Sequence, residues 1–406
     1  MNSIATRFAV ASLLSLLLGS ASAIYAQDVA PWSQSPYETG RQIKPPEDIG
    51  ASMIPAFQFS AKSNVSSLAW SPDGETLAVG GSDSVFICSR RGEILKTFST
   101  RAEVLEPNAP QEKEDPLQDK AVRDLSVTGL WWSPDGKSLA ARVAEGGVPV
   151  WNVETDNLRF VLGDHQGGTL CLAWSPKSDL LATGGGDKKI TLFDAATGKL
   201  TQTLDHHLFP VTQVAFGAKE SELVSLGVRP QYGPQNTEIK RWDIEKKTTV
   251  SETSQDYGSA YSVLSAQGTL CSFLTPLDEN TRLYSVTLLS TESGSTVTTG
   301  FTALSGYRYV NAAGGNMPYL SGVFHLFSPG ETAFVMSVWD EKGLGAQAWN
   351  VKGAKPLMWF YSKVPDPPKA RRGQSVTSFG AATISKKGFI AASLNSTVQI
   401  WAPPGG

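Results

Sequence analysis

Aromatic residues recur at a fixed interval along this chain. Trp132, Trp174 and Phe216 are separated by 42 residues each time, and each ends a short apolar run. Trp151 and Phe193 form a second pair with the same 42-residue step. Two markers that share one period indicate a repeating unit, and about 40 to 45 residues is the length of a four-stranded propeller blade. The spacing therefore predicts an all-β ring of repeats, a kind of scaffold that presents surfaces to partners.

Seven such units can be laid out within residues 51–406, which we expect to form a single β-propeller domain. The strands are almost continuously apolar, as expected when neighbouring blades cover both faces of each sheet. The fifth unit is the least regular, so a six-bladed ring with that unit dissolved into loops is the alternative. We predict a seven-bladed β-propeller of four-stranded antiparallel blades.

The two ends of the repeat array predict how the ring closes. The last unit stops at Trp401 without a fourth strand, and residues 56–59 offer a strand before the first unit. An N-terminal strand that completes the last blade would remove an open sheet edge. We therefore expect closure by residues 51–60.

Short motifs at the strand ends resemble the WD-repeat β-propeller family, over about residues 54–402. The motifs are Trp70–Gly74, Trp132–Gly136, Gly184–Asp187, Phe193–Asp194 and Arg241–Asp243. Each Ser-Pro-Asp-Gly places Pro and Gly where a tight hairpin turn needs them. The resemblance is clear in the first four units and poor in the fifth.

The resemblance also implies structural hydrogen-bonded sets of His, Ser or Thr, Asp and Trp. In the third unit His165, Thr183 and Asp187 match this pattern, with Phe193 in place of the Trp. In the fourth unit the matching residues are His207, Ser225 and Trp242, and no Asp is obvious. Other units lack the His, so packing between blades must contribute more of the stability.

The first 26 residues are typical of a signal peptide. Arg7 precedes an apolar run over residues 8–18, and Ala21–Ala23 is a small-residue cleavage site. Cleavage after Ala23 or after Ala26 fits the pattern. Residues 27–50 are polar and proline-rich, and are expected to be a tail. The mature protein would be periplasmic or extracellular, without membrane insertion.

Charge and cysteine content limit the partners and the covalent chemistry. The net charge is −3 and no strong basic patch occurs, so nucleic acid and anionic membranes are poor partners. With three cysteines, Cys88, Cys171 and Cys271, the chain has at least one free thiol. Whether two of them form a disulfide is left open by the sequence. We expect a monomer.

Nothing in the sequence favours catalysis. The chain has four histidines and no nucleophile elbow, phosphate loop or calcium loop. Adjacent His206 and His207 would point to opposite faces of a strand, which makes a poor chelate. We therefore assign no catalytic residue, metal or cofactor.

Four long insertions fall on one end of the expected ring, since loops between blades share that end with loops between second and third strands. They are residues 99–123, 227–238, 301–320 and 361–375. The first is acidic, and the fourth is basic. Tyr and Arg are typical interface anchors, and the candidate partner-binding residues are Phe301, Tyr307, Arg308, Tyr309, Tyr319, Arg371 and Arg372. A protein-interaction scaffold is the favoured function; an enzyme or small-ligand binder in the central channel is the alternative.

Overall fold

A computed structural model gives the fold of this chain. It describes residues 55–61, 63–101, 125–144, 147–163, 165–229, 236–256, 262–276, 283–304, 309–310, 316–317, 325–340, 343–352, 356–361, 379–394 and 396–402. Residues 51–406 form one compact unit. The regular elements of the described residues are all β-strands. No helix among these residues is long and apolar enough to cross a lipid bilayer.

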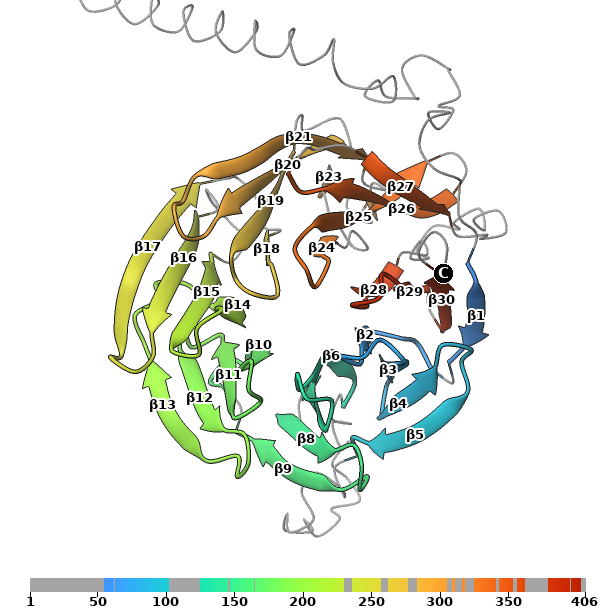
Figure 1. Cartoon of the computed structure of the whole chain (residues 1–406), viewed down its shortest axis with the longest axis horizontal. Helices are drawn as coiled ribbons and strands as arrows, with labels where there is room; N and C mark the ends of the chain where they lie inside the picture. Colours follow the sequence, from blue (N-terminus) through green and yellow to red (C-terminus); the bar gives the residue numbers. More distant parts are fainter. Residues whose placement is uncertain are drawn as a thin grey trace, which may run out of the picture. The chain divides into compact units, whose positions relative to one another are not determined.

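Seven four-stranded antiparallel sheets follow one another around a common centre, with the first strand of each inside (Figure 1). The first three blades consist of β2 (Ser67–Trp70), β3 (Thr76–Gly80), β4 (Ser84–Ser89), β5 (Ile94–Ser99); β6 (Val127–Trp132), β7 (Ser138–Val143), β8 (Val148–Asn152), β9 (Leu158–Leu162); and β10 (Thr169–Trp174), β11 (Leu180–Gly185), β12 (Ile190–Asp194), β13 (Leu200–Leu204). This arrangement confirms the predicted propeller.

The remaining blades include the one that the sequence left in doubt. Blades four to six consist of β14 (Val211–Phe216), β15 (Glu222–Val228), β16 (Asn236–Asp243), β17 (Thr248–Asp256); β18 (Ser262–Leu264), β19 (Leu270–Pro276), β20 (Leu283–Ser290), β21 (Thr296–Leu304); and β24 (His325–Phe327), β25 (Ala333–Asp340), β26 (Gly343–Asn350), β27 (Pro356–Tyr361). The fifth blade is a complete sheet in the order β18-β19-β20-β21, so the ring has seven blades and not six.

The seventh blade is closed by the N-terminal strand, as predicted. Its own strands are β28 (Phe379–Ile384), β29 (Ile390–Leu394) and β30 (Thr397–Trp401), and β1 (Phe57–Ser60) is the fourth. Phe57 lies opposite Ile400 in this antiparallel pair, and Phe59 lies opposite Val398. Both phenylalanines pack against the apolar cluster between the last and first blades.

The core is divided into seven apolar clusters, one between each pair of neighbouring blades. Adjacent residues of a strand point to opposite faces, and β11 illustrates the consequence. Leu181 packs in the cluster shared with the second blade, whereas Ala182 packs in the cluster shared with the fourth. Each blade thus buries both faces, which explains the continuously apolar strands.

A serine-initiated turn joins the first two strands in six of the seven blades. In the first blade the Gly74 N–H donates to the Ser71 carbonyl, and the backbone φ of Gly74 is +71°. The equivalent turns are Ser133–Gly136, Ser175–Ser178, Ser265–Gly268, Ser328–Glu331 and Ser385–Gly388. The serine hydroxyl also accepts a backbone N–H from the start of the second strand. This turn therefore marks the repeat even in the irregular fifth blade.

Two of the predicted insertions are shorter than the sequence suggested. Strand β21 continues to Leu304, because its Thr-rich sequence suits a strand and pairs along β20. Within the following segment, β22 (Tyr309–Val310) and β23 (Asn316–Met317) form a small hairpin. Similarly, β15 and β16 pair out to Val228 and Thr237, which leaves 229–235 as the connecting loop.

Candidate functional site

The four insertions attach at one end of the ring, which we call the loop face. They join β5 to β6, β15 to β16, β21 to β24 and β27 to β28. Strands alternate in direction within each antiparallel blade, so these four connections share an end. Of the seven candidate partner-binding residues, five lie outside the described residues, namely Tyr307, Arg308, Tyr319, Arg371 and Arg372.

The other two candidates lie in strands. Phe301 belongs to β21, where it is paired with Val286, and not to a loop as predicted. Tyr309 belongs to the small hairpin, where it is paired with Met317. The structure thus assigns these two residues to separate sheets within the described part of the chain.

One described element of the loop face is the segment that joins β13 to β14. It exposes Leu208, whose relative accessibility is 65%. Two buried side chains of β16 hold this segment. The Leu208 backbone N–H donates to Glu238 Oε2 at 2.9 Å, and the Lys240 ammonium donates to the His206 carbonyl. An apolar side chain is therefore held outward by buried polar contacts.

His165 connects three elements of the third blade. Its Nδ1 lies 2.8 Å from Asp187 Oδ1, in the turn between β11 and β12, and its Nε2 lies 2.8 Å from Thr183 Oγ1 on β11. Thr183 is fully buried and His165 is 8% exposed. Phe193, which replaces the usual Trp, packs in the core between the second and third blades.

The fourth blade has a similar set with a different carboxylate. His207 Nε2 lies 2.7 Å from Ser225 Oγ, and the Trp242 indole N–H donates to the same hydroxyl at 2.7 Å. His207 Nδ1 lies 3.1 Å from Glu238 Oε2. Sequence reasoning missed Glu238, because it lies within β16 and not in the turn before it. The available signal was an acidic residue directly before the apolar Ile239.

Glu238 and Lys240 form a buried ion pair beside this set. Glu238 is 1% exposed and Lys240 is 4% exposed. Lys240 Nζ lies 3.6 Å from Glu238 Oε1 and 3.4 Å from Glu252 Oε2, on the neighbouring β17. Burial raises the pKa of Glu238, but hydrogen bonds from His207 and the Leu208 N–H, with the charges of His207 and Lys240, outweigh it. The pKa of this carboxyl is therefore lowered.

These sets hold the fold together and offer no reacting group to solvent. A carboxylate, His and Ser in sequence also occur in serine-nucleophile sites. Here Ser225 is completely buried and its hydroxyl already accepts the Trp242 N–H. Among the described residues, no group of three or more His, Cys, Asp or Glu side chains could hold a metal ion.

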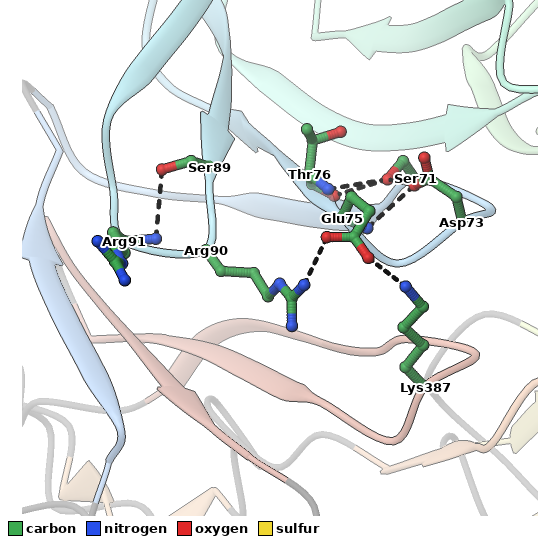
Figure 2. Close-up of polar contacts among 8 residues, drawn as sticks. All are labelled: Ser71, Asp73, Glu75, Thr76, Ser89, Arg90, Arg91 and Lys387. Atoms are coloured by element: carbon green, nitrogen blue, oxygen red, sulfur yellow. Dashed lines mark hydrogen bonds and ion pairs between the residues drawn. The ribbon is translucent and has the colours of Figure 1, made fainter. Parts of the chain in front are cut away.

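The opposite end of the ring, which we call the turn face, carries the serine turns and cross-links between blades. Lys177 pairs with Glu220 of the next blade at 2.6 Å. At the closure seam, Glu75 lies between Arg90 of its own blade and Lys387 of the last blade, and pairs with both (Figure 2). Neighbouring blades are therefore joined by polar contacts as well as apolar ones.

Comparison with known proteins agrees with this architecture. The family model described as "WD domain, G-beta repeat" matches residues 54–87 and 156–194. The chain is a seven-bladed β-propeller, and these parts of it match the WD-repeat family. The matched residues cover parts of the first three blades, whose turns and His set were given above.

Three curated WD-repeat proteins illustrate the similarity. The human F-box-like/WD repeat-containing protein TBL1Y is 30% identical over 182 residues, 44% of this chain and 34% of that protein. Mouse TBL1X is 31% identical over 153 residues, 38% of this chain and 28% of that protein. WD repeat-containing protein slp1 of Schizosaccharomyces pombe is 30% identical over 166 residues, which are 39% of this chain and 33% of that protein. The match thus spans about a third of each relative.

One groove of this propeller lies on the turn face, between the first and second blades. Its volume is about 440 Å³. The turns Ser71–Gly74 and Ser133–Gly136 form its rim, and strand β5 contributes Leu95 and Lys96. Trp132 and Val153 contribute apolar surface from the second blade. Sequence reasoning missed this groove, because its residues come from two repeats.

Proposed function

We propose that this chain is a non-enzymatic protein-interaction module that binds a protein partner through its loop face. The observation that carries the proposal is Leu208, an exposed leucine on a segment held by the buried side chains of Glu238 and Lys240. A pre-ordered apolar anchor loses little conformational entropy when a partner covers it. The general role of WD-repeat propellers as interaction scaffolds supports the same reading.

The chemistry of the insertions supports a partner-binding role for the same end. The first insertion is acidic and the fourth contains Arg371 and Arg372. The third contains Tyr307, Arg308 and Tyr319. Aromatic and arginine side chains are enriched among residues that dominate binding energy. We propose these side chains, with Phe301 and Tyr309, as further contacts for the same partner.

We propose further that the module acts outside the cytoplasm, as a monomer. Arg7, the apolar residues 8–18 and Ala21–Ala23 support an export signal. Mass spectrometry of the protein from its native host tests this proposal. A chain beginning at Ile24 or Gln27 would agree with it, and a chain that retains residues 1–23 would contradict it.

The interaction is tested by affinity capture from the exported fraction with the wild-type chain, a Leu208→Ser variant and a Leu200→Ser variant. Leu200 is the matched control, because it is 62% exposed on β13, outside the loop face. A partner identified by mass spectrometry should then bind the purified wild-type and Leu200→Ser proteins, with binding at least tenfold weaker for Leu208→Ser. Equal binding by all three proteins would reject Leu208 as the anchor.

Replacement of residues 305–320 and 362–375 by short Gly-Ser turns tests the rest of the surface. The proposal expects this variant to lose the same partner while its thermal unfolding stays unchanged. A partner retained in full would move the interaction to another face of the ring.

A further inference from the structure

The groove between the first two blades has an apolar lining that is open to solvent. Leu95, on the outer strand β5, is 53% exposed. Trp132 donates its indole N–H to the Ala69 carbonyl at 3.1 Å, so the polar group of this ring is already satisfied within the protein. Pro72 and Pro134 flank these side chains. The volume of about 440 Å³ lies in the range of roughly 300–1,000 Å³ that is usual for ligand pockets.

Two carboxylates border this apolar lining. Asp73 and Asp135 occupy equivalent positions in the two serine turns, and both are exposed. Each carboxylate accepts a hydrogen bond from its own turn, at Ser71 and Ser133. Within the described part of the chain, neither has a Lys or Arg at ion-pair distance. The hydrogen bonds from the Ser71 hydroxyl and the Glu75 N–H lower the pKa of Asp73, and so does the charge of Lys387, which itself pairs with Glu75.

The one cation in the lining is already neutralised. Lys96 Nζ lies 2.6 Å from Asp156 Oδ1 and also donates to the Val153 carbonyl. These partners belong to the second blade, so Lys96 acts as a bridge across the base of the groove. Among the lining residues, the charge without an ion-pair partner is therefore that of Asp73 and Asp135, and it is negative.

The next seam, between the second and third blades, has larger side chains at the equivalent positions. Phe160 of β9 and Lys96 of β5 occupy equivalent positions in their blades. Phe160 pairs with Val150 of β8, and Lys96 pairs with Ile87 of β4. Phe160 packs tightly against Gly198 of the third blade. The neighbouring Arg159 donates to the Ala196 carbonyl and the Ser138 hydroxyl, each at 2.9 Å. Larger side chains thus fill the space that is left open between the first and second blades.

We propose that this groove binds a short extended segment of a protein partner, with an apolar side chain next to Lys or Arg. The apolar side chain would lie over Leu95 and Trp132, and the cation would lie between Asp73 and Asp135. Ionic attraction to two carboxylates favours such a segment over a neutral or acidic one. This site is on the turn face, so it is separate from the loop-face interaction proposed above.

The test uses a random dodecapeptide library displayed on phage, selected against the immobilised full-length chain. Enriched peptides are then measured by fluorescence anisotropy with wild-type, Leu95→Ser, Asp73→Asn/Asp135→Asn and Leu200→Ser proteins. The asparagine variants keep a side-chain oxygen for the turn hydrogen bonds, and thermal unfolding confirms that every variant is folded. Leu208→Ser identifies peptides that bind the loop face instead.

The proposal expects a class of peptides with Leu, Ile or Phe beside Lys or Arg. These should bind Leu95→Ser and the double asparagine variant at least fivefold more weakly than wild type, and Leu200→Ser and Leu208→Ser equally well. Binding of this class should also weaken from 50 to 300 mM salt. The proposal is overturned if no such class is enriched, or if all enriched peptides bind Leu95→Ser and the asparagine variant as well as wild type.

Discussion

Glu238 and Lys240 are charged side chains in the interior of a strand whose neighbours Ile239 and Trp242 belong to the apolar core. Desolvation of two charges is costly, and their attraction offsets the cost only when other hydrogen bonds complete the site. Here His207 and the Leu208 N–H bond to Glu238 Oε2, and the His206 carbonyl accepts from Lys240, while Glu238 Oε1 has only its 3.6 Å ion-pair contact with Lys240. The arrangement joins β16 to the segment that carries Leu208, so a buried pair serves to orient an exposed residue.

Removal of Glu238 should be strongly destabilising. Glu238→Ala leaves Lys240 buried without its buried carboxylate partner, and breaking a buried pair typically costs about 3 to 5 kcal/mol. Glu252→Ala removes the other carboxylate near Lys240, but the Glu252 side chain is 47% exposed. Its loss should cost less than about 1 kcal/mol. Chemical denaturation of the two variants measures both free energies, and equal losses would contradict this account.

The same carboxyl predicts how stability depends on pH. A group whose pKa is lowered by folding adds stability above its unfolded-state pKa, and that stability is lost as the pH falls through the folded-state pKa. The pKa of Glu238 is lowered from an ordinary value of 4.5. The free energy of unfolding should therefore fall below about pH 4.5 more steeply for wild type than for Glu238→Gln. Parallel pH profiles would show that Glu238 contributes nothing to acid unfolding.

At the scale of the element, β1 decides whether the ring is closed. Its side chains alternate, with Phe57 and Phe59 half-buried and Gln58 and Ser60 exposed. The two phenylalanines pack across the seam between the first and last blades. This strand supplies an outer edge for the last blade and part of the core for the first, so its removal affects two blades together.

The alternation offers a matched pair of variants. Phe57→Ala/Phe59→Ala should destabilise the ring by about 3 kcal/mol in total, since a fully buried Phe→Ala change costs about that much alone and both rings are half-exposed. Gln58→Ala/Ser60→Ala changes the same strand on its exposed face and should be nearly neutral. Calorimetry should also show a single unfolding transition for each protein. Equal unfolding temperatures for the two variants would mean that β1 does not secure the seam.

Elements that follow the repeat were predictable from the sequence, and elements set by an insertion were not. The apolar runs and Ser-Pro-Asp-Gly motifs predicted the blades, and β1 followed from the missing fourth strand. The fifth blade was doubtful because it has no such motif, although Ser265 and Gly268 make the same turn without the proline. Glu238 was missed because the insertion at 229–235 separates the carboxylate from its usual place in the repeat. The groove needs Asp73 and Asp135 from different blades, and no local pattern joins them.

For the whole molecule, stability is shared among seven seams, each with its own apolar cluster. A ring of this kind has no central core, so each blade depends on both neighbours. The three cysteines show how completely the seams are separated. Cys88 lies in the seam between the last and first blades, Cys171 between the third and fourth, and Cys271 between the fourth and fifth. All three are free and buried, which answers the open question of a disulfide.

This distribution predicts the reactivity of the thiols. Thiolate is the reactive form of cysteine, and burial raises the pKa of Cys88 to about 11 and that of Cys171 to about 12, with that of Cys271 raised as well. A disulfide reagent such as DTNB should therefore leave the folded chain unlabelled at pH 8 and label three thiols per chain in guanidinium without reductant. Leu200→Cys, which places a thiol on an exposed outer strand, is the positive control and should react at once. Fewer than three thiols after unfolding would reveal a disulfide, and fast reaction of the folded wild type would show that a seam opens on the timescale of labelling.

Because each thiol reports on a different seam, labelling during gradual denaturation also tests whether the ring unfolds as one cooperative unit. Simultaneous exposure of all three thiols requires the seams to open together.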